Sequence, residues 1–368
     1  LCRQGIGCRF LRQAQGGRGK LLARERISGT SMRTRAIYGC AGLTLTEDER
    51  AFFCEAQPWG FIVFARNIAD RAQLRALCDA LRETVGDANA PILIDQEGGR
   101  VARMKPPEWK THAPARIFGE LYASDPERAR EATYLNARLI AHDLNEVGLN
   151  VDCLPVLDVP VEGASDVIGD RAFAFEPSTI IDLGRAQIEG LMDGGVLPVM
   201  KHIPGHGRAA ADTHFELPHV TASADALSAS DFVTFRSLSD CPMAMTAHVV
   251  YDAIDNNRPA TTSPKVIRDV IRGQIGFEGV LMSDDLSMKA LTGSIRSRAK
   301  AALFAGCDVV LHCNGGFAEM QEVAQEAGPL ESASLKRTET ALSHLKSPAN
   351  FNWVKAERRL AELMASVA

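Results

Sequence analysis

The sequence predicts an α/β protein folded as a single (β/α)8 TIM-type barrel with extra C-terminal helices. The first observation is a series of eight short apolar runs, most of them followed by an amphipathic stretch. Such runs are typical of parallel strands, which are buried on both faces and lose period-two alternation. The second observation is the length of 368 residues, which suits a barrel of about 250 residues with additions. A doubly wound open sheet is the main alternative, because periodicity does not show whether a sheet closes.

The predicted strands and helices alternate along the chain. The strand segments are residues 36–40, 60–64, 91–95, 151–159, 196–202, 241–249, 279–285 and 307–313. The main helical segments between them are residues 70–85, 125–147, 181–193, 224–238, 264–275 and 297–305. The tail from Ser332 onward predicts two further helices packed on the outside. No internal repeat or composition break interrupts residues 36–345, which argues against a second domain.

The first 31 residues differ in composition from the rest of the chain. They are rich in Arg and Gly, contain Glu25 as their one acid, and do not begin with Met. An arginine-rich transit peptide is one interpretation. Because Met32 sits directly before the first strand segment, we expect it to be the natural start and residues 1–31 to be a disordered extension or a translated upstream stretch. The barrel domain is then residues 32–368.

Composition excludes several classes of partner. The net charge of -5 shows no basic excess, so nucleic acid and anionic membranes are not expected to bind. No run of 18 or more apolar residues exists, and the N-terminus lacks the apolar centre of a secretory signal. The nine cysteines are odd in number and never spaced as CxxC, which is typical of reduced thiols. We expect a cytoplasmic monomer.

Polar residues cluster where the predicted strands end. These residues are Asp95, Asp158, Lys201, His202, His248, Asp284 and Asp285. In an α/β barrel the active site lies at the carboxyl ends of the strands, where the loops converge. Any single one of these residues could instead cap a helix, but their common position indicates a site.

The loop KHIPGHGRAAADTH, residues 201–214, follows the fifth predicted strand. Its proline and two glycines exclude a helix as far as Gly207. His202 and His206 have the spacing of a zinc-binding helix, but that chemistry needs both on one helical face with a glutamate between them. We therefore expect neither a metal nor a cofactor.

Two carboxylate centres point to acid/base and nucleophilic chemistry. Asp212 lies two residues before His214, so it can orient the imidazole and make it a general acid/base; a solvated polar loop is the alternative. Asp284 and Asp285 end the seventh strand. Because side chains alternate along extended chain, one aspartate can act as a nucleophile while its neighbour braces the loop.

Three motifs in this order carry a family resemblance. LIDQEGGRVARM, KHIPGHG with ADTH, and LMSDDLSM resemble the bacterial single-domain β-N-acetylhexosaminidases of glycoside hydrolase family 3, the NagZ type, over residues 36–345. The resemblance implies an exo-acting, retaining enzyme. Such enzymes remove terminal non-reducing β-linked N-acetylglucosamine from muropeptide fragments during peptidoglycan recycling.

The resemblance also implies roles for individual residues. Asp284 matches the nucleophile, His214 the general acid/base, and Asp212 the residue that activates His214. Five residues match positions that bind the sugar: Asp95, Arg103, Arg171, Lys201 and His202. His206 has no implied role beyond positioning or loop packing. A histidine in place of the usual second carboxylate also permits phosphorolysis, since it does not repel a phosphate acceptor.

Other functions stay open at this stage. A metal-dependent barrel hydrolase would lose activity with a chelator. A β-glucosidase of the same family would act on a different sugar. A glycoside phosphorylase of the family would use phosphate in place of water as the acceptor. A sugar-binding barrel that senses cell-wall fragments would keep Asp95, Arg103 and Lys201 without needing Asp284. The aglycone, whether an anhydromuropeptide or a chitin oligomer, is not determined by these motifs.

Overall fold

The computed structural model describes residues 33–209, 213 and 216–365. Residues Met32–Ala368 form one compact unit. Residues 1–31 lie outside the described residues. The expectation that they are a disordered extension or a translated upstream stretch therefore stays a prediction. Asp212 and His214 also lie outside the described residues.

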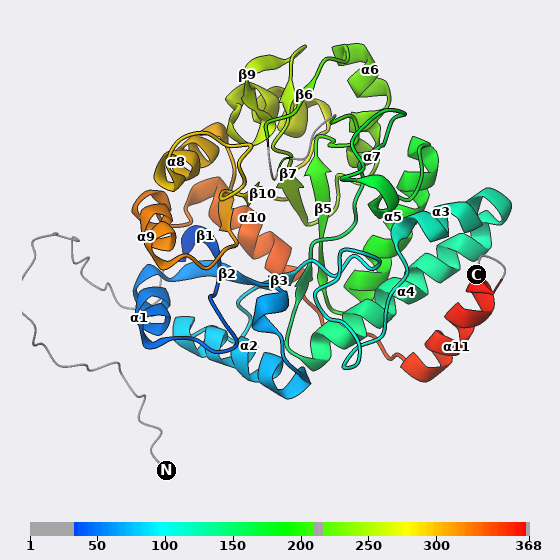
Figure 1. The fold of residues 1–368 in the computed structure, drawn as a ribbon, viewed down its shortest axis with the longest axis horizontal. Coiled ribbons are helices and arrows are strands. Elements are labelled where there is room, and N and C mark those ends of the chain that lie inside the picture. The colour runs from blue at the N-terminus through cyan, green and yellow to red at the C-terminus, as the bar shows by residue number, and fades with distance from the viewer. Residues whose placement is uncertain (1–32, 210–212, 214–215, 366–368) are drawn as a thin grey trace, which may run out of the picture. The chain divides into compact units, whose positions relative to one another are not determined.

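Eight parallel strands close into a barrel (Figure 1). The strands are β1 (Thr34–Gly39), β2 (Pro58–Val63), β3 (Ile92–Ile94), β4 (Val151–Asp152), β5 (Leu197–Ile203), β7 (Met243–Thr246), β10 (Val280–Asp285) and β11 (Val309–His312). The barrel is closed by the pairing of β1 with β11, in which Ala36 lies opposite Val310. The predicted TIM-type barrel is therefore confirmed, and the doubly wound open sheet is excluded.

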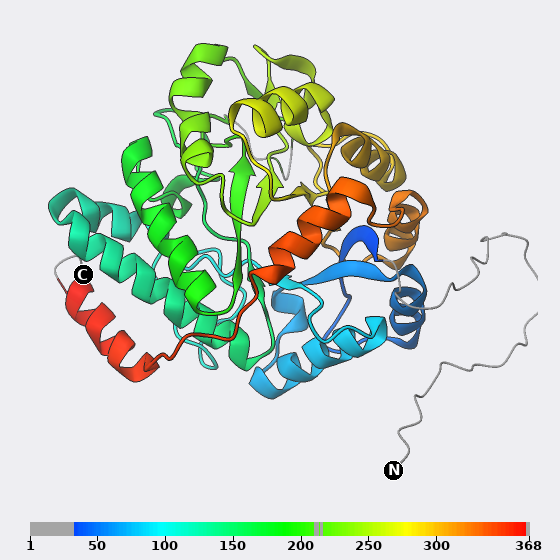
Figure 2. The ribbon, with the colours of Figure 1, turned by 180° about the vertical axis from the view of Figure 1, so that it is seen from behind.

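Helices surround the strands on the outside, as the front and rear views show (Figures 1 and 2). The α-helices are α1 (Glu47–Ala56), α2 (Arg71–Val85), α3 (Ala115–Ser124), α4 (Pro126–Glu146), α5 (Pro177–Asp193), α6 (Ala224–Ala229), α7 (Asp231–Ser237), α8 (Ile295–Ala305), α9 (Phe317–Glu326), α10 (Ser332–Ser343) and α11 (Trp353–Met364). The other helical pieces are the 3-10 turns η1 (Ala65–Asn67), η2 (Gly169–Arg171) and η3 (Ala260–Thr262) and the π-helix η4 (Val266–Gln274). The two C-terminal helices predicted after Ser332 are α10 and α11.

Two predicted elements differ from the structure. The strand predicted at residues 151–159 has only two residues in β4, followed by an isolated bridge between Val156 and Lys201, because Pro155 has no N–H to donate to a sheet. The helix predicted at residues 224–238 is divided at Ser230, whose backbone leaves the helical conformation.

The inside of the barrel is a packed apolar core. Its residues come from several strands and from the segment that closes the bottom: Ile37, Ile62, Leu93, Val151, Val199, Met245, Met282, Leu311 and Leu330. A second apolar cluster lies largely between the outer faces of the strands and the helices. Since the interior is filled, substrate has access only to the strand ends and loops.

A small sheet of β6 (His219–Val220), β8 (Val250–Tyr251) and β9 (Asp255–Pro259) lies beyond the barrel strands. β6 pairs in parallel with β8. This pairing attaches the end of the loop that follows β5 to the loop that follows β7. Among the described helices, none has the length and apolar character needed to cross a membrane.

Candidate active site

A buried lysine joins two carboxylates at the carboxyl ends of β3 and β5. Lys201 is 2% exposed, and its Nζ lies 2.9 Å from Asp95 Oδ1 and 2.6 Å from Glu97 Oε1. Burial alone would raise the pKa of Asp95, but the charges of Lys201 and Arg103 outweigh it and hold that pKa well below its usual range. Asp95 is therefore a carboxylate, and an acceptor for hydroxyl groups, at neutral pH.

Two arginines complete the charged network. The Nε and Nη2 of Arg171, from η2, each lie 2.9 Å from one oxygen of Glu97. Arg103 Nη2 donates to Asp95 Oδ2 at 3.0 Å. Burial raises the pKa of Glu97, yet Arg171 and Lys201 outweigh burial and lower it to about 2. Three cations and two carboxylates are thus held in fixed positions by direct ion pairs.

The turn after β3 is held by the buried side chain of Gln96. Its Oε1 accepts from the backbone N–H groups of Arg103 and Met104 at 2.9 and 3.0 Å, and its Nε2 donates to the Met104 carbonyl at 3.0 Å. Gln96 N donates to Asp152 Oδ1 at 3.0 Å. Gly98 has a φ of 94°, and a Cβ there would lie 2.4 Å from the Ala113 carbonyl oxygen. The turn that carries Asp95 therefore has a fixed conformation.

A fully buried aspartate lies behind the segment that follows β5. Asp158 has 0% exposure, and its Oδ2 is 2.7 Å from His202 Nδ1. Its Oδ1 accepts from His202 N at 3.2 Å and from His206 N at 2.6 Å. Burial raises the pKa of Asp158, but His202 and these hydrogen bonds outweigh it and lower the pKa to about 2.

His206 is a second buried histidine in this turn. It is 3% exposed, its Nδ1 has no hydrogen-bond partner among the described residues, and its ring centroid is 5.5 Å from that of His202. Burial lowers its pKa to about 4. The ring is therefore neutral at physiological pH. No helix forms in the described residues 204–209, which agrees with that part of the loop predicted at residues 201–214, whereas residues 201–203 belong to β5.

Asp284 is the penultimate residue of β10 and lies near the same groups. Burial raises its pKa, but its interactions with His248, His202, the Asp285 N–H and Lys201 outweigh burial and lower it. Its Oδ1 accepts from Asp285 N at 2.7 Å, which fixes the side chain. Asp284 is therefore an ionised carboxylate held in one orientation, the state that a nucleophile requires.

Asp285 faces a different set of partners. Its Oδ1 accepts from Ser287 N and from Cys313 N, both at 3.1 Å, and its Oδ2 accepts from the Ser287 hydroxyl. The bonds to Ser287 and Cys313 join the loop after β10 to the end of β11. Asp285 thus braces the loop, the role that the sequence suggested for one of the two aspartates.

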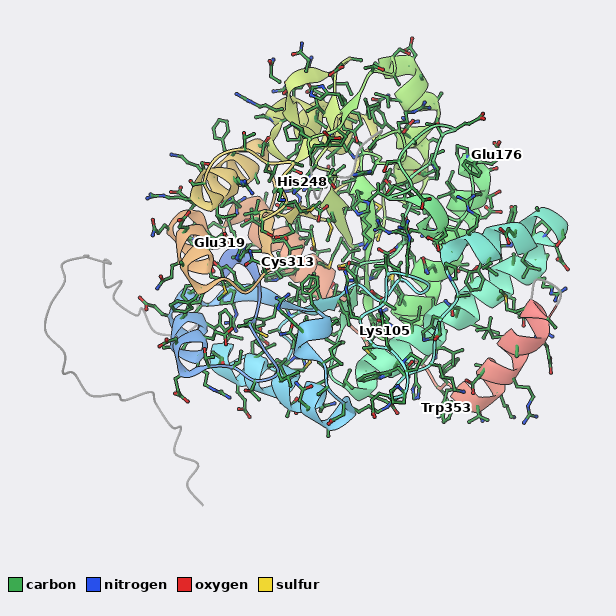
Figure 3. The ribbon with its side chains drawn as sticks, in the orientation of Figure 1. Lys105, Glu176, His248, Cys313, Glu319 and Trp353 are labelled. Atoms are coloured by element: carbon green, nitrogen blue, oxygen red, sulfur yellow. The ribbon has the colours of Figure 1, made fainter. Side chains whose placement is uncertain are left out.

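His248 supports the chain beside Asp284. It is fully buried, and its Nε2 donates to the Asp285 carbonyl oxygen at 3.0 Å. Its Nδ1 lies 2.7 Å from Thr261 Oγ1, and burial lowers its pKa. Figure 3 labels His248 and Cys313 toward the middle of the ribbon, whereas Trp353 lies near its edge.

The structure brings together six of the eight residues singled out from the sequence. Asp95, Arg103, Arg171, Lys201, His202 and Asp284 form one linked group. Asp212 and His214 lie outside the described residues, so their roles stay predictions. The residue between them, Thr213, is 3% exposed, and its carbonyl accepts from Ala290 N at 3.2 Å.

Sequence reasoning missed three supporting residues. Glu97 has no role predicted from the sequence, although it lies only two residues after Asp95. Asp158 and His248 were noted at strand ends without a role. In the described part of the chain, no group of three or more His, Cys, Asp or Glu side chains is placed to hold a metal ion.

The chain is similar to a known family of glycosidases over most of its length. Residues 36–345 match the Glycosyl hydrolase family 3 N terminal domain. A protein named beta-hexosaminidase from Alkalilimnicola ehrlichii is 42% identical over 284 residues, which span 76% of this chain and 80% of that protein. A beta-hexosaminidase from Thiobacillus denitrificans is 39% identical over 280 residues, 74% and 76% of the two chains.

Solved structures give the same relationship. NagZ from Neisseria gonorrhoeae, in complex with N-trifluoroacetyl-D-glucosamine, superposes with a TM-score of 0.81 at 30% identity and covers 90% of this chain and 98% of that one. A structure of the same NagZ in complex with zinc ion has a TM-score of 0.80 with the same identity and coverage.

Proposed function

Because the chain belongs to glycosyl hydrolase family 3 and is a glycoside hydrolase of the beta-hexosaminidase type, we propose that it is a retaining exo-β-N-acetylglucosaminidase. The observation that carries the proposal is the charged network beside Asp284 at the carboxyl ends of β3, β5 and β10. Carboxylates accept from sugar hydroxyls, while Lys and Arg donate to hydroxyl and carbonyl oxygens. A network of both kinds holds a sugar in one orientation.

The substrate would bind as a terminal β-linked N-acetylglucosamine over this network. Asp95, Arg103, Arg171, Lys201 and His202 would contact the hydroxyls and the N-acetyl group. The complex of the Neisseria gonorrhoeae NagZ with N-trifluoroacetyl-D-glucosamine supports this choice of sugar. Charge-assisted hydrogen bonds of this kind are roughly twice as strong as neutral ones, so they can pay for desolvating a polar sugar.

Cleavage would proceed in two steps. Asp284 attacks the anomeric carbon and His214 protonates the departing glycosidic oxygen, which forms a glycosyl ester on Asp284. His214 then removes a proton from water, the water oxygen attacks the anomeric carbon, and the carboxylate of Asp284 leaves. Two inversions at one carbon give net retention. Asp212 would orient the imidazole of His214 in both steps.

The natural substrate would be a peptidoglycan fragment, and the enzyme would recycle cell-wall sugars in the cytoplasm as a monomer. The resemblance to the NagZ type supports this assignment. Chitin oligomers are the competing source of the same terminal sugar. Hydrolysis of an anhydromuropeptide with a kcat/KM at least tenfold above that of chitobiose would favour peptidoglycan.

The decisive experiment compares an aryl β-glucosaminide with and without its N-acetyl group. We expect turnover of the N-acetyl substrate only, with the β-anomer released first in water as followed by NMR. Release of the α-anomer would exclude retention. The same assay in phosphate buffer decides between water and phosphate as the acceptor, because a glycosyl phosphate would appear in place of the free sugar.

The same assays test two alternative functions, a metal-dependent hydrolase and a β-glucosidase. A metal-dependent hydrolase would lose activity with EDTA and regain it with zinc, whereas the proposed mechanism needs no metal. A β-glucosidase would hydrolyse aryl β-glucoside as fast as the N-acetylglucosaminide. We expect full activity in EDTA and a strong preference for the N-acetyl sugar.

A further inference from the structure

Asp158 and His202 form a pair whose chemistry extends the proposed site. Asp158 has 0% exposure and uses both oxygens within the segment after β5. Its Oδ1 accepts hydrogen bonds from two backbone N–H groups. Its Oδ2 lies 2.7 Å from the ring nitrogen Nδ1 of His202. The carboxylate therefore contacts His202 through Nδ1, and the ring nitrogen Nε2 is available to a ligand.

The ionised carboxylate decides where the His202 proton lies. Asp158 Oδ1 accepts from two backbone N–H groups, which stabilise the ionised form, so at neutral pH Asp158 is an acceptor only. A contact of 2.7 Å then requires a hydrogen on Nδ1. In a neutral imidazole the other nitrogen, Nε2, keeps its lone pair and accepts.

We propose that Asp158 is a positioning residue that holds His202 as the neutral Nδ1–H tautomer, so that Nε2 accepts a hydrogen bond from a sugar hydroxyl. This proposal rests on the proposed function. It also fits the surrounding charges, because Lys201, Arg103 and Arg171 supply donors only. The carboxylates of Asp95 and Glu97 already bind these cations, so His202 supplies an acceptor that is not held by a cation.

The substitution Asp158→Asn replaces the acceptor that faces His202 Nδ1 by a donor, with little change in the shape of the side chain. The amide oxygen can keep the two backbone hydrogen bonds. The amide nitrogen would face His202 Nδ1 and donate to it, which moves the ring hydrogen to Nε2. A reversed tautomer behind a catalytic histidine is known to be costly even when the geometry is kept.

The tautomer is measured directly by 15N NMR of the histidine rings in the full chain at pH 7.5. His202→Gln identifies the His202 signal. We expect a protonated Nδ1 and an unprotonated Nε2 in the wild type, and the reverse in Asp158→Asn. A doubly protonated ring, or an Nε2–H ring in the wild type, would overturn the proposal. This readout does not depend on hexosaminidase activity, so it is separate from the test of the proposed function.

The acceptor role is measured with N-acetylglucosamine analogues that carry fluorine in place of one hydroxyl at C3, C4 or C6. Fluorine cannot donate a hydrogen bond. At the position that faces His202 we expect fluorine to weaken competitive inhibition about tenfold or more in the wild type. The same fluorine should cost little in Asp158→Asn, whose Nε2–H donates. An equal penalty in both proteins at every position would contradict the acceptor role.

Asp308→Asn is the matched control. Asp308 is also a buried carboxylate, held by Arg272 and Arg337 just before β11, at the opposite end of the barrel. This variant is expected to lower Tm while leaving the His202 tautomer and the fluorine penalties unchanged. If Asp308→Asn changed the fluorine penalties as Asp158→Asn does, the effect would be one of general destabilisation and the proposal would fail.

Discussion

Arg171 binds Glu97 through two parallel hydrogen bonds of 2.9 Å, from Nε to Oε2 and from Nη2 to Oε1. Lys201 approaches the same carboxylate at 2.6 Å. One side chain thus orients two of the cations proposed to bind the sugar. Because bidentate pairing adds geometric specificity to its energy, Glu97 determines where the donors of the site lie.

Replacing Glu97 by Gln should impair substrate binding without removing a group proposed to contact the sugar. The amide keeps one acceptor oxygen, so Arg171 loses its bidentate partner and Lys201 loses a charge. We expect kcat/KM for an aryl β-N-acetylglucosaminide to fall about 10- to 100-fold. Exposed Glu83 on α2 is the control, and Glu83→Gln should behave as the wild type. Unchanged kinetics in Glu97→Gln would contradict the orienting role.

Glu97 should also contribute to stability at neutral pH and lose that contribution in acid. Its pKa is lowered from 4.5 to about 2 in the folded chain, so the folded state favours the ionised form. The stabilisation is present above pH 4.5 and is lost as the pH falls from 4.5 through 2. On the order of 3 kcal/mol is at stake.

The measurement is the free energy of unfolding by urea at pH 7 and at pH 3. The difference between wild type and Glu97→Gln should shrink at pH 3. The other buried carboxylates, such as Asp158, titrate in both proteins and largely cancel in this comparison. A difference that stays constant over the range would show that Glu97 is not ionised preferentially in the folded state.

The adjacent aspartates at the end of β10 should differ sharply in their effect on activity. Asp284→Asn removes the proposed nucleophile, and kcat should fall about 10⁴-fold or more. Asp285→Asn keeps an oxygen for the N–H groups of Ser287 and Cys313, so we expect a lower Tm and kcat within about tenfold of wild type. Both are measured on one aryl substrate. Wild-type-like turnover in Asp284→Asn would exclude it as the nucleophile.

The barrel was predictable because each strand is buried on both faces and therefore appears in the sequence as a run of apolar residues. Runs such as residues 196–202 carry no polar residue until Lys201 and His202, which end the strand. The short β4 was not predictable from hydrophobicity, since residues 153–159 are buried too but make irregular contacts. The break at Ser230 is not marked by any change in the pattern of apolar residues.

The site was predictable where a residue belongs to a motif at a strand end. Asp95, Lys201 and Asp284 satisfy that condition. Glu97 does not, because its direction depends on how Gly98 and Gly99 turn the chain. Asp158 was visible at the right position, yet its partnership with His202 joins residues 44 apart in sequence. Long-range pairings of this kind follow from the closed barrel and not from local spacing.

The proposed acid/base should show itself in the dependence on leaving group. His214→Ala should reduce kcat/KM by about 10² to 10⁴ for a substrate with a poor leaving group, such as an alkyl glycoside. A dinitrophenyl glycoside needs little protonation and should lose far less. Asp212→Asn should show the same pattern, more weakly. Equal losses for good and poor leaving groups would argue that His214 does not protonate the departing oxygen.

Gly207 tests whether the turn after β5 must hold its shape for activity. A Cβ at this position would lie 2.0 Å from the Val159 carbonyl oxygen and 2.3 Å from its carbon, so Gly207→Ala must move one of two backbone segments. We expect a loss of about 1–3 kcal/mol or more in the free energy of unfolding, measured by urea denaturation. Activity should fall further than stability explains, because the displaced backbone carries His206 and, through it, a hydrogen bond to Asp158.

Gly328→Ala is the comparison, since a Cβ there meets nothing within 4 Å in the part of the chain that the structure describes and the residue has no positive φ. Its effect on the free energy of unfolding should lie within about 0.5 kcal/mol, with unchanged kcat/KM. If Gly207→Ala lost stability but kept wild-type kinetics at a temperature where it is fully folded, the turn could shift without consequence. The close packing against Val159 would then serve the fold alone and not the placement of the catalytic segment.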